Sequence, residues 1–185
     1  MIILEIILLW SLYYFLHSFL ATVYIKSKVE KSFPTLYPYY RILYNVLSFL
    51  LLIILYGLTE SFEHKLLFPQ SSWLKIFANF LLILGFIILF LSFKNYDKRE
   101  FLGLTVSSNK TQLSTGGLNA YFRHPLYIGT ILLLIGFFLL NPHLNRLLYV
   151  SISLLYLPIG SRLEELKLKQ VFGEAYKSYL KKVKF

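Results

Sequence analysis

Three apolar runs, each long enough to cross a lipid bilayer, restrict what this chain can fold into. They cover residues 2–25, 42–59 and 73–93, and about 20 apolar residues in a helix span the ~30 Å hydrocarbon core of a membrane. The chain is 57% hydrophobic and 15% charged, whereas soluble domains carry about 25% charged residues. We therefore predict a polytopic membrane protein whose main partner is the lipid bilayer.

The first apolar run is expected to stay in the mature protein as a membrane helix. A cleavable signal peptide begins with a basic segment and ends with a small-x-small cleavage site. This run lacks the basic segment, carries Glu5, and shows no such cleavage site before Lys26.

Two shorter apolar runs, at 125–140 and 147–160, flank the turn signal Asn141-Pro142 and predict a tight helical hairpin. At 1.5 Å per residue, each arm reaches about 24 Å or less. From Arg162 onward, apolar residues alternate with lysines in a pattern that predicts an amphipathic interfacial helix, interrupted near Gly173. The predicted fold is one all-α domain, residues 1–185, with about five spans.

The basic residues indicate an orientation and account for the formal charge of +10. Most lysines and arginines lie in the loops 26–41 and 94–123 and in the tail from Arg162, which five spans place on the same side. The positive-inside rule then puts the N-terminus outside and the tail in the cytoplasm. The predicted location is a bacterial inner membrane, and the charge is explained without a nucleic-acid partner.

Metal chemistry is not expected. The chain has no cysteine, so disulfides and thiolate sites are excluded. Haem needs axial ligands at matched depth on facing helices, and the predicted topology leaves His17 in the first span without such a mate. A polar side chain inside a span still needs a partner, most often on another helix.

A first polar cluster, Arg123-His124-Pro125, opens the fourth apolar run. Proline at a helix start is ordinary architecture, and Arg123 could extend to lipid phosphates. The alternative is functional, because His124 would lie at a helix N-terminus with Tyr127 one turn on, where free N–H groups attract a carboxylate.

A second polar cluster, Glu164-Glu165, stands where the last apolar run ends. A capping box from Ser161 to Glu164 explains one glutamate structurally, and an ion pair with Lys169 explains the other. Two adjacent carboxylates at a membrane boundary are costly, however, and a ligand amine or sulfonium would offset them. The segment Ser114 to Gly117 has two readings as well, a turn or a close backbone approach to a ligand.

These two clusters resemble the isoprenylcysteine carboxyl methyltransferase and phospholipid methyltransferase superfamily. The resemblance rests on these segments: Arg123-His124-Pro125-Leu126-Tyr127-Ile128-Gly129, Glu164-Glu165, and Phe172-Gly173-Glu174-Ala175-Tyr176 with Tyr179. Upstream segments at 16–21, 40–45 and 96–104 look like the branch that contains methanethiol S-methyltransferases and NnrU-like proteins.

The resemblance implies an integral membrane enzyme that uses S-adenosylmethionine as co-substrate. By position in the family's motifs, the implied cofactor-binding residues are Gln112, Leu113, Ser114, Gly117, His124, Pro125, Leu126, Tyr127, Glu164, Glu165 and Tyr176. Catalytic candidates are Glu164, Glu165 and, as a base for a thiol, His17.

Two departures from the family pattern are relevant. Asn119 replaces a family tyrosine, which weakens one expected cofactor contact, and Gly160 stands where the carboxyl methyltransferases place an arginine. The second departure favours a methyl acceptor without a carboxylate, such as a thiol or a lipid amine, and we expect a thiol. Methylation of a prenylcysteine carboxyl or a phospholipid amine, and a non-enzymatic role in membrane transport or assembly, stay open as alternatives.

Overall fold

The computed structural model describes residues 2–62, 65–94 and 113–183, and within these ranges the chain is helical. They hold seven α-helices and one 3-10 helix, joined by loops and one isolated β-bridge. The all-α prediction is confirmed. The chain divides into two compact units, one with helices α1 to α3 and one with α4, the 3-10 helix η1, and α6 to α8.

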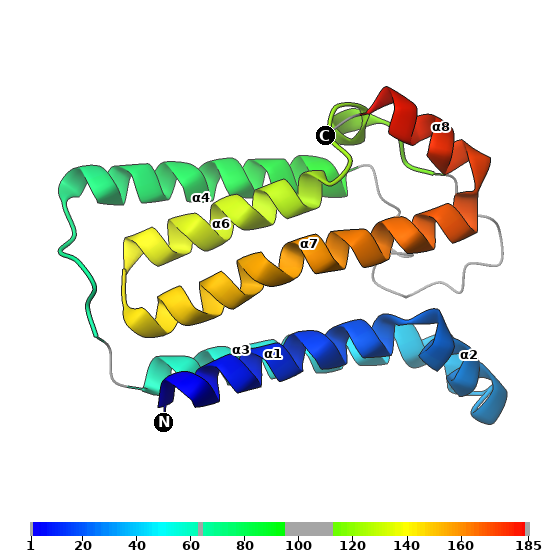
Figure 1. Cartoon of the computed structure of the whole chain (residues 1–185), viewed down its shortest axis with the longest axis horizontal. Coiled ribbons are helices and arrows are strands. Elements are labelled where there is room, and N and C mark those ends of the chain that lie inside the picture. The colour runs from blue at the N-terminus through cyan, green and yellow to red at the C-terminus, as the bar shows by residue number, and fades with distance from the viewer. Residues whose placement is uncertain (1, 63–64, 95–112, 184–185) are drawn as a thin grey trace. The chain divides into compact units, whose positions relative to one another are not determined.

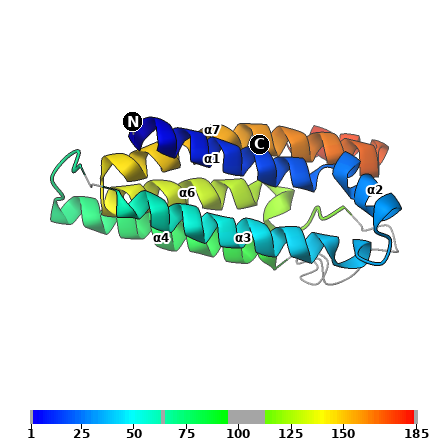
Figure 2. The ribbon, with the colours of Figure 1, turned by 90° about the horizontal axis from the view of Figure 1, so that it is seen from below.

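The first unit pairs α1 (Ile2–Ala21) with α3 (Tyr37–Ser61) and places α2 (Val23–Ser32) at one end of the pair (Figure 2). Polar side chains join the two long helices. Trp10 donates to the Thr59 hydroxyl over 2.9 Å, and His17 Nδ1 lies 3.0 Å from Ser48 Oγ. This contact confirms the expectation that His17 finds its partner on another helix. An unpaired polar group would be costly in a lipid environment.

The limits of the first two spans differ from those predicted. Helix α1 ends at Ala21, and Thr22 caps α2 by accepting a 3.3 Å hydrogen bond from the Ile25 amide, so 22–25 do not extend the first span. Helix α2 occupies part of the predicted loop 26–41, and α3 begins at Tyr37 with a proline in its first turn. Apolar runs locate lipid-facing stretches, whereas caps and prolines set where helices begin.

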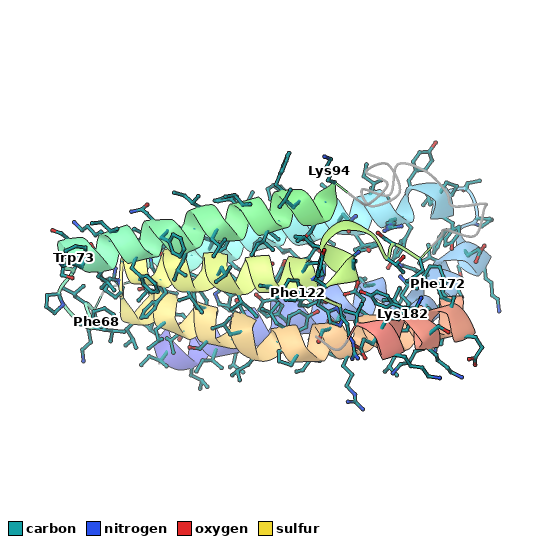
Figure 3. The ribbon with its side chains drawn as sticks, turned by 90° about the horizontal axis from the view of Figure 1, so that it is seen from above. Phe68, Trp73, Lys94, Phe122, Phe172 and Lys182 are labelled. Atoms are coloured by element: carbon teal, nitrogen blue, oxygen red, sulfur yellow. The ribbon has the colours of Figure 1, made fainter. Side chains whose placement is uncertain are left out.

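The second unit is built from α4 (Ser72–Phe93), η1 (Gly117–Ala120), α6 (Pro125–Leu140), α7 (Leu144–Phe172) and α8 (Glu174–Lys182). Helix α6 lies between α4 and α7 and runs antiparallel to both, and α8 folds back beside η1 (Figure 1). Phe122, Phe172 and Lys182 lie at one end of this unit, and Phe68 and Trp73 lie at the other (Figure 3).

Small residues let α4 and α6 approach until their backbones touch. A Cβ atom added at Gly85 would lie 2.9 Å from the Gly129 carbonyl oxygen, and one added at Gly136 would lie 2.9 Å from the Ala78 carbonyl oxygen. Close approach through small residues is how membrane helices gain packing energy when lipid already solvates their apolar side chains. The contact also fixes α6, and with it the polar cluster that precedes α6.

The turn between α6 and α7 is held by the segment that leads into α4. The Leu67 amide donates to the Pro142 carbonyl over 2.9 Å, and the Leu144 amide donates to the Lys65 carbonyl over 2.9 Å. The Gln70 side chain donates to the carbonyls of Leu139 and Leu140. The predicted hairpin at Asn141-Pro142 is confirmed, and these bonds satisfy backbone groups at both helix ends.

The last helix of the hairpin is longer than predicted. Helix α7 runs unbroken from Leu144 to Phe172 and contains Pro158, so it does not end at 160 and the capping-box interpretation of Ser161 is wrong. A cap needs a free helix start, whereas Ser161 lies inside α7 and donates to the Pro158 carbonyl over 3.0 Å. The predicted interruption is confirmed at Gly173, whose φ of 52° is a conformation that glycine adopts without strain.

Three helices, α1, α3 and α4, are long and apolar enough to cross a membrane, and α6 is a shorter apolar helix. Large apolar side chains are exposed along them, among them Phe49, Phe80 and Phe86. Such surfaces fit hydrocarbon rather than water. The protein is therefore an integral membrane protein surrounded by lipid.

Candidate functional site

The first polar cluster stands at the beginning of α6. His124 is the residue before the helix, with φ −132° and ψ 60°, and the buried Pro125 occupies the first helical turn. The helix start predicted from Arg123-His124-Pro125 is confirmed. Because proline fixes its own φ and restricts the residue before it, the sequence itself holds His124 outside the helix with its ring free to face α7.

The structure brings this histidine together with both glutamates of the second cluster. His124 Nε2 lies 3.2 Å from Glu165 Oε1, and His124 Nδ1 lies 3.9 Å from Glu164 Oε2. An ionised carboxylate only accepts hydrogen bonds, so His124 donates to Glu165 through Nε2. In the neutral ring, Nδ1 is then an acceptor that faces a second acceptor on Glu164.

The two glutamates have different surroundings. Glu165, 23% exposed, has Arg123 on one side and Lys169 on the other, each with a nitrogen 3.9 Å from its carboxylate. Glu164 is 42% exposed, and its carboxylate lies 3.9 Å from His124 Nδ1; among the described residues, no lysine or arginine pairs with it. Glu165 therefore anchors the histidine, and Glu164 keeps acceptor capacity for a ligand with a positive charge.

Tyr127 lies one turn into α6 and completes the contact with α7. Its ring meets the His124 ring edge to face, with centroids 5.3 Å apart. A Cβ atom added at the buried Gly160 would lie 3.4 Å from the Tyr127 hydroxyl, an ordinary van der Waals contact. The tyrosine hydroxyl thus lies directly against α7 at this position.

Helix α8 closes one side of the cluster with Tyr176. This side chain is 1% exposed and packs with Tyr179 and Val183 in a core that includes Leu113. Burial first, and then the charges of Glu165 and Glu164, raise the pKa of Tyr176 to about 12. The neutral phenol is favoured there because an anion would be desolvated beside two carboxylates.

This pKa gives a measurable expectation. The packing of α8 should be intact below pH 10, the ordinary tyrosine pKa, and weaken as pH rises toward 12, because the detached helix releases the proton more readily than the packed one. The ultraviolet tyrosinate signal of wild type minus Tyr176→Phe should appear near pH 12. A difference signal that titrates with the bulk tyrosines would contradict this environment for Tyr176.

The segment before the histidine forms a turn built on Asn119. Gly117 has a φ of 59°, which glycine adopts readily. Asn119 is 5% exposed, and its side-chain amide donates to the Ser114 carbonyl over 3.1 Å. The backbone carbonyl of Asn119 accepts from the Tyr179 hydroxyl over 2.7 Å. The turn interpretation of Ser114 to Gly117 therefore holds, and Asn119 has a structural role in it.

Two features leave room for a ligand beside this turn. The Asn119 side-chain oxygen is buried and has no hydrogen-bond partner in the described part of the chain, and such orphaned acceptors are uncommon. A cleft of about 330 Å³ runs between the turn and α8, and its polar lining comes from Thr115, Ser178 and Lys182.

Of the other predicted site residues, Leu113 packs against the Tyr176 core and Leu126 lies in the first turn of α6. Gln112 and the upstream segment 96–104 lie outside the described residues. His17 belongs to the first unit, and its role as a base stays a prediction. No group of three or more His, Asp or Glu that could hold a metal occurs in the described ranges.

Sequence reasoning missed the role of Arg123. Its guanidinium donates from Nε to the Val183 carbonyl over 2.6 Å and from a terminal nitrogen to the Leu180 carbonyl over 3.0 Å. The hydrogen bond of Tyr179 to the Asn119 carbonyl is likewise not predicted from the sequence. Every residue has a backbone carbonyl, so the sequence does not show which carbonyls accept a side-chain hydrogen bond. The only indication in the sequence is that Arg123 and Tyr179 have side chains that donate hydrogen bonds.

Comparison with known families covers nearly the whole chain. The family model described as NnrU protein matches residues 5–177, and no curated protein or solved structure matches the chain. The matched region includes the His124 cluster, both glutamates and Tyr176. The chain belongs to the NnrU protein family, within the isoprenylcysteine methyltransferase-like group.

Proposed function

We propose that the protein is an integral membrane methyltransferase that uses S-adenosylmethionine and methylates a small or lipophilic acceptor, most simply a thiol. One observation carries the proposal. The first residue of the His124-Pro125-Leu126-Tyr127 motif and the adjacent glutamates of α7 meet at 3.2 and 3.9 Å, although 40 positions separate them in the sequence. Their types match the family's cofactor motif at a place where unpaired polar groups would be costly.

The residues fit a donor that carries a sulfonium and an ammonium group. Glu164 and His124 Nδ1 present two acceptors to a cation. When bound, S-adenosylmethionine supplies an activated methyl group with a good leaving group. The protein then needs mainly to align the acceptor with the donor and to exclude water.

Individual residues have distinct tasks in this proposal. Glu164 complements the positive charge of the donor, while Glu165 holds the imidazole of His124 by its Nε2 hydrogen. Tyr127 packs against that ring through its edge-to-face contact. Helix α8 supplies the buried Tyr176, whose raised pKa reflects the nearby charges of both glutamates. A thiol acceptor also needs a base to reach its thiolate form; His17, in the first unit, stays a sequence-based candidate for that base.

The surroundings of the cluster favour an acceptor without a carboxylate. A carboxylate needs a cation or several donors at close range. Position 160 offers no side chain and is covered by the Tyr127 hydroxyl, and Arg123 is engaged with the carbonyls of Leu180 and Val183. Arg162 is exposed on α7 and lies two positions after 160, on a different face of the helix, so it does not replace the family arginine.

The proposed topology has five spans, with α6 and the first half of α7 as a short hairpin, the N-terminus outside and the tail cytoplasmic in a bacterial inner membrane. Helix α6 has 16 residues, about 24 Å at 1.5 Å per residue, so the bilayer would be locally thin there. Helix α8 turns Tyr176 and Tyr179 inward and exposes Lys177, Lys181 and Lys182. This pattern supports an interfacial position for the tail.

The decisive experiment measures labelled-methyl transfer by the purified protein to a thiol, a prenylcysteine and an aminophospholipid in parallel. We expect transfer to the thiol, less to the aminophospholipid and none to the prenylcysteine carboxyl. If the protein shows no saturable binding of S-adenosylmethionine, the proposal is wrong. In that case His124→Ala and Glu164→Ala should change stability only, as expected of anchors in a transport or assembly protein.

A further inference from the structure

The last turn of α8 is held by an arginine from the other side of the site. Arg123 donates from Nε to the Val183 carbonyl and from a terminal nitrogen to the Leu180 carbonyl, at 2.6 and 3.0 Å. Carbonyls at a helix C-terminus lack partners within the helix, and a cation there also interacts favourably with the helix dipole. The planar guanidinium can serve both carbonyls at once, which a lysine ammonium at the end of a flexible chain does less well.

The same guanidinium reaches the oxygen that orients the histidine. Its remaining terminal nitrogen lies 3.9 Å from Glu165 Oε1, and this oxygen accepts from His124 Nε2 at 3.2 Å. Arg123 therefore contacts both α8 and the carboxylate that fixes His124. A change at Arg123 would be felt at both places.

Two further features fix the position of α8. At its start, Gly173 sets the direction of the chain with a φ of 52°. In its middle, the Tyr179 hydroxyl donates to the Asn119 carbonyl over 2.7 Å. Since Tyr176 lies between these points and is 1% exposed, the placement of its ring beside the glutamates depends on how firmly α8 is held.

We propose that Arg123 is a positioning residue for the site of the proposed methyltransferase, on which this inference rests. By holding the end of α8, Arg123 keeps Tyr176 beside Glu164 and Glu165. By its contact with Glu165, it keeps that carboxylate turned toward His124, so that Glu164 is left to the cationic donor. Arg123 itself does not contact the donor.

The test compares Arg123→Lys with Arg162→Lys, a matched change at an exposed arginine of α7. Two measurements are made on the full chain in lipid nanodiscs: hydrogen exchange of the α8 amides, and KM and kcat with S-adenosylmethionine. For Arg123→Lys we expect α8 exchange to be about 10-fold faster or more, since two charge-assisted hydrogen bonds are weakened. We expect KM to rise about 10-fold with kcat changed by less than about 3-fold. Arg162→Lys should leave both within about 2-fold of wild type.

Different failures have different meanings. Unchanged α8 exchange, or faster exchange with an unchanged KM, would overturn the role of Arg123 while leaving the proposed function in place. Absence of S-adenosylmethionine binding by the wild type would overturn the proposed function and, with it, this inference. Should Arg123→Lys not fold, Tyr179→Phe loosens α8 through its bond to Asn119. An unaltered KM in that variant despite faster α8 exchange would equally overturn the dependence of the site on α8.

Discussion

Replacing Glu164 by glutamine should weaken the binding of S-adenosylmethionine by about 10- to 100-fold. The substitution keeps the size of the side chain and removes its charge, and a hydrogen bond or contact to a charged group is worth about 1.5–3 kcal/mol, with 1.4 kcal/mol for each factor of ten. Because no lysine or arginine pairs with Glu164 among the described residues and its side chain is 42% exposed, little internal structure depends on its charge. Binding should therefore fall while stability changes little. Calorimetric titration of the purified protein, together with its detergent unfolding curve, measures both.

A matched control is available on α8. Glu174 is 83% exposed and pairs with Lys177 on the same exposed surface over 2.7 Å, a contact of the kind that contributes little. Glu174→Gln should bind S-adenosylmethionine as the wild type does. Equal affinities for wild type, Glu164→Gln and Glu174→Gln would remove Glu164 from the donor site, and a loss of folding in Glu164→Gln would assign it a structural role instead.

The second large effect is expected at the contact between α4 and α6. The double substitution Gly85→Ala with Gly136→Ala forces methyl groups to within 2.9 Å of the Gly129 and Ala78 carbonyl oxygens. Backbone atoms on a packed helix cannot move away as the end of a flexible side chain can. Overpacking costs about 1–3 kcal/mol at each site, and alanine regains about 1 kcal/mol at each through helix propensity, so the pair should lose up to about 4 kcal/mol, a large part of a typical total stability. The midpoint of an SDS titration, followed by circular dichroism, measures the loss.

Gly57 provides the control for this experiment. It lies inside α3, and a Cβ atom there would meet nothing within 4 Å. Since alanine favours a helix over glycine by about 1 kcal/mol, Gly57→Ala should be neutral or slightly stabilising. Equal midpoints for the double variant and Gly57→Ala would mean that the two backbones do not touch.

The meeting of His124 with the glutamates could be foreseen from the sequence. The turn at Asn141-Pro142 and two uninterrupted helical arms imply an antiparallel hairpin, so positions at similar distances from the turn must face each other. The contacts follow this rule along the whole hairpin. Phe137 and Tyr149 have ring centroids 6.2 Å apart, Tyr127 faces Gly160, and His124 faces Glu165.

The attachments of α8 could not be foreseen in the same way. Arg123 binds backbone carbonyls and Asn119 accepts through its own backbone, and every residue type carries such groups. Which of these groups meet depends on the direction that the chain takes at Gly173. The sequence predicts the position of this bend but not its direction. The end of α7 was missed for a related reason. The apolar run ends at Gly160, yet the backbone hydrogen bonds of the helix continue to Phe172.

The hairpin also links the evolution of two distant stretches of the chain. His124 and Glu165 are each set by counting residues back to the same turn, which is pinned to the segment before α4 by the Leu67 and Leu144 amides. One residue inserted in either arm would move His124 or Glu165 about 100° around its helix and 1.5 Å along it. Length changes in NnrU relatives that keep this site should therefore occur in both arms together or fall outside them.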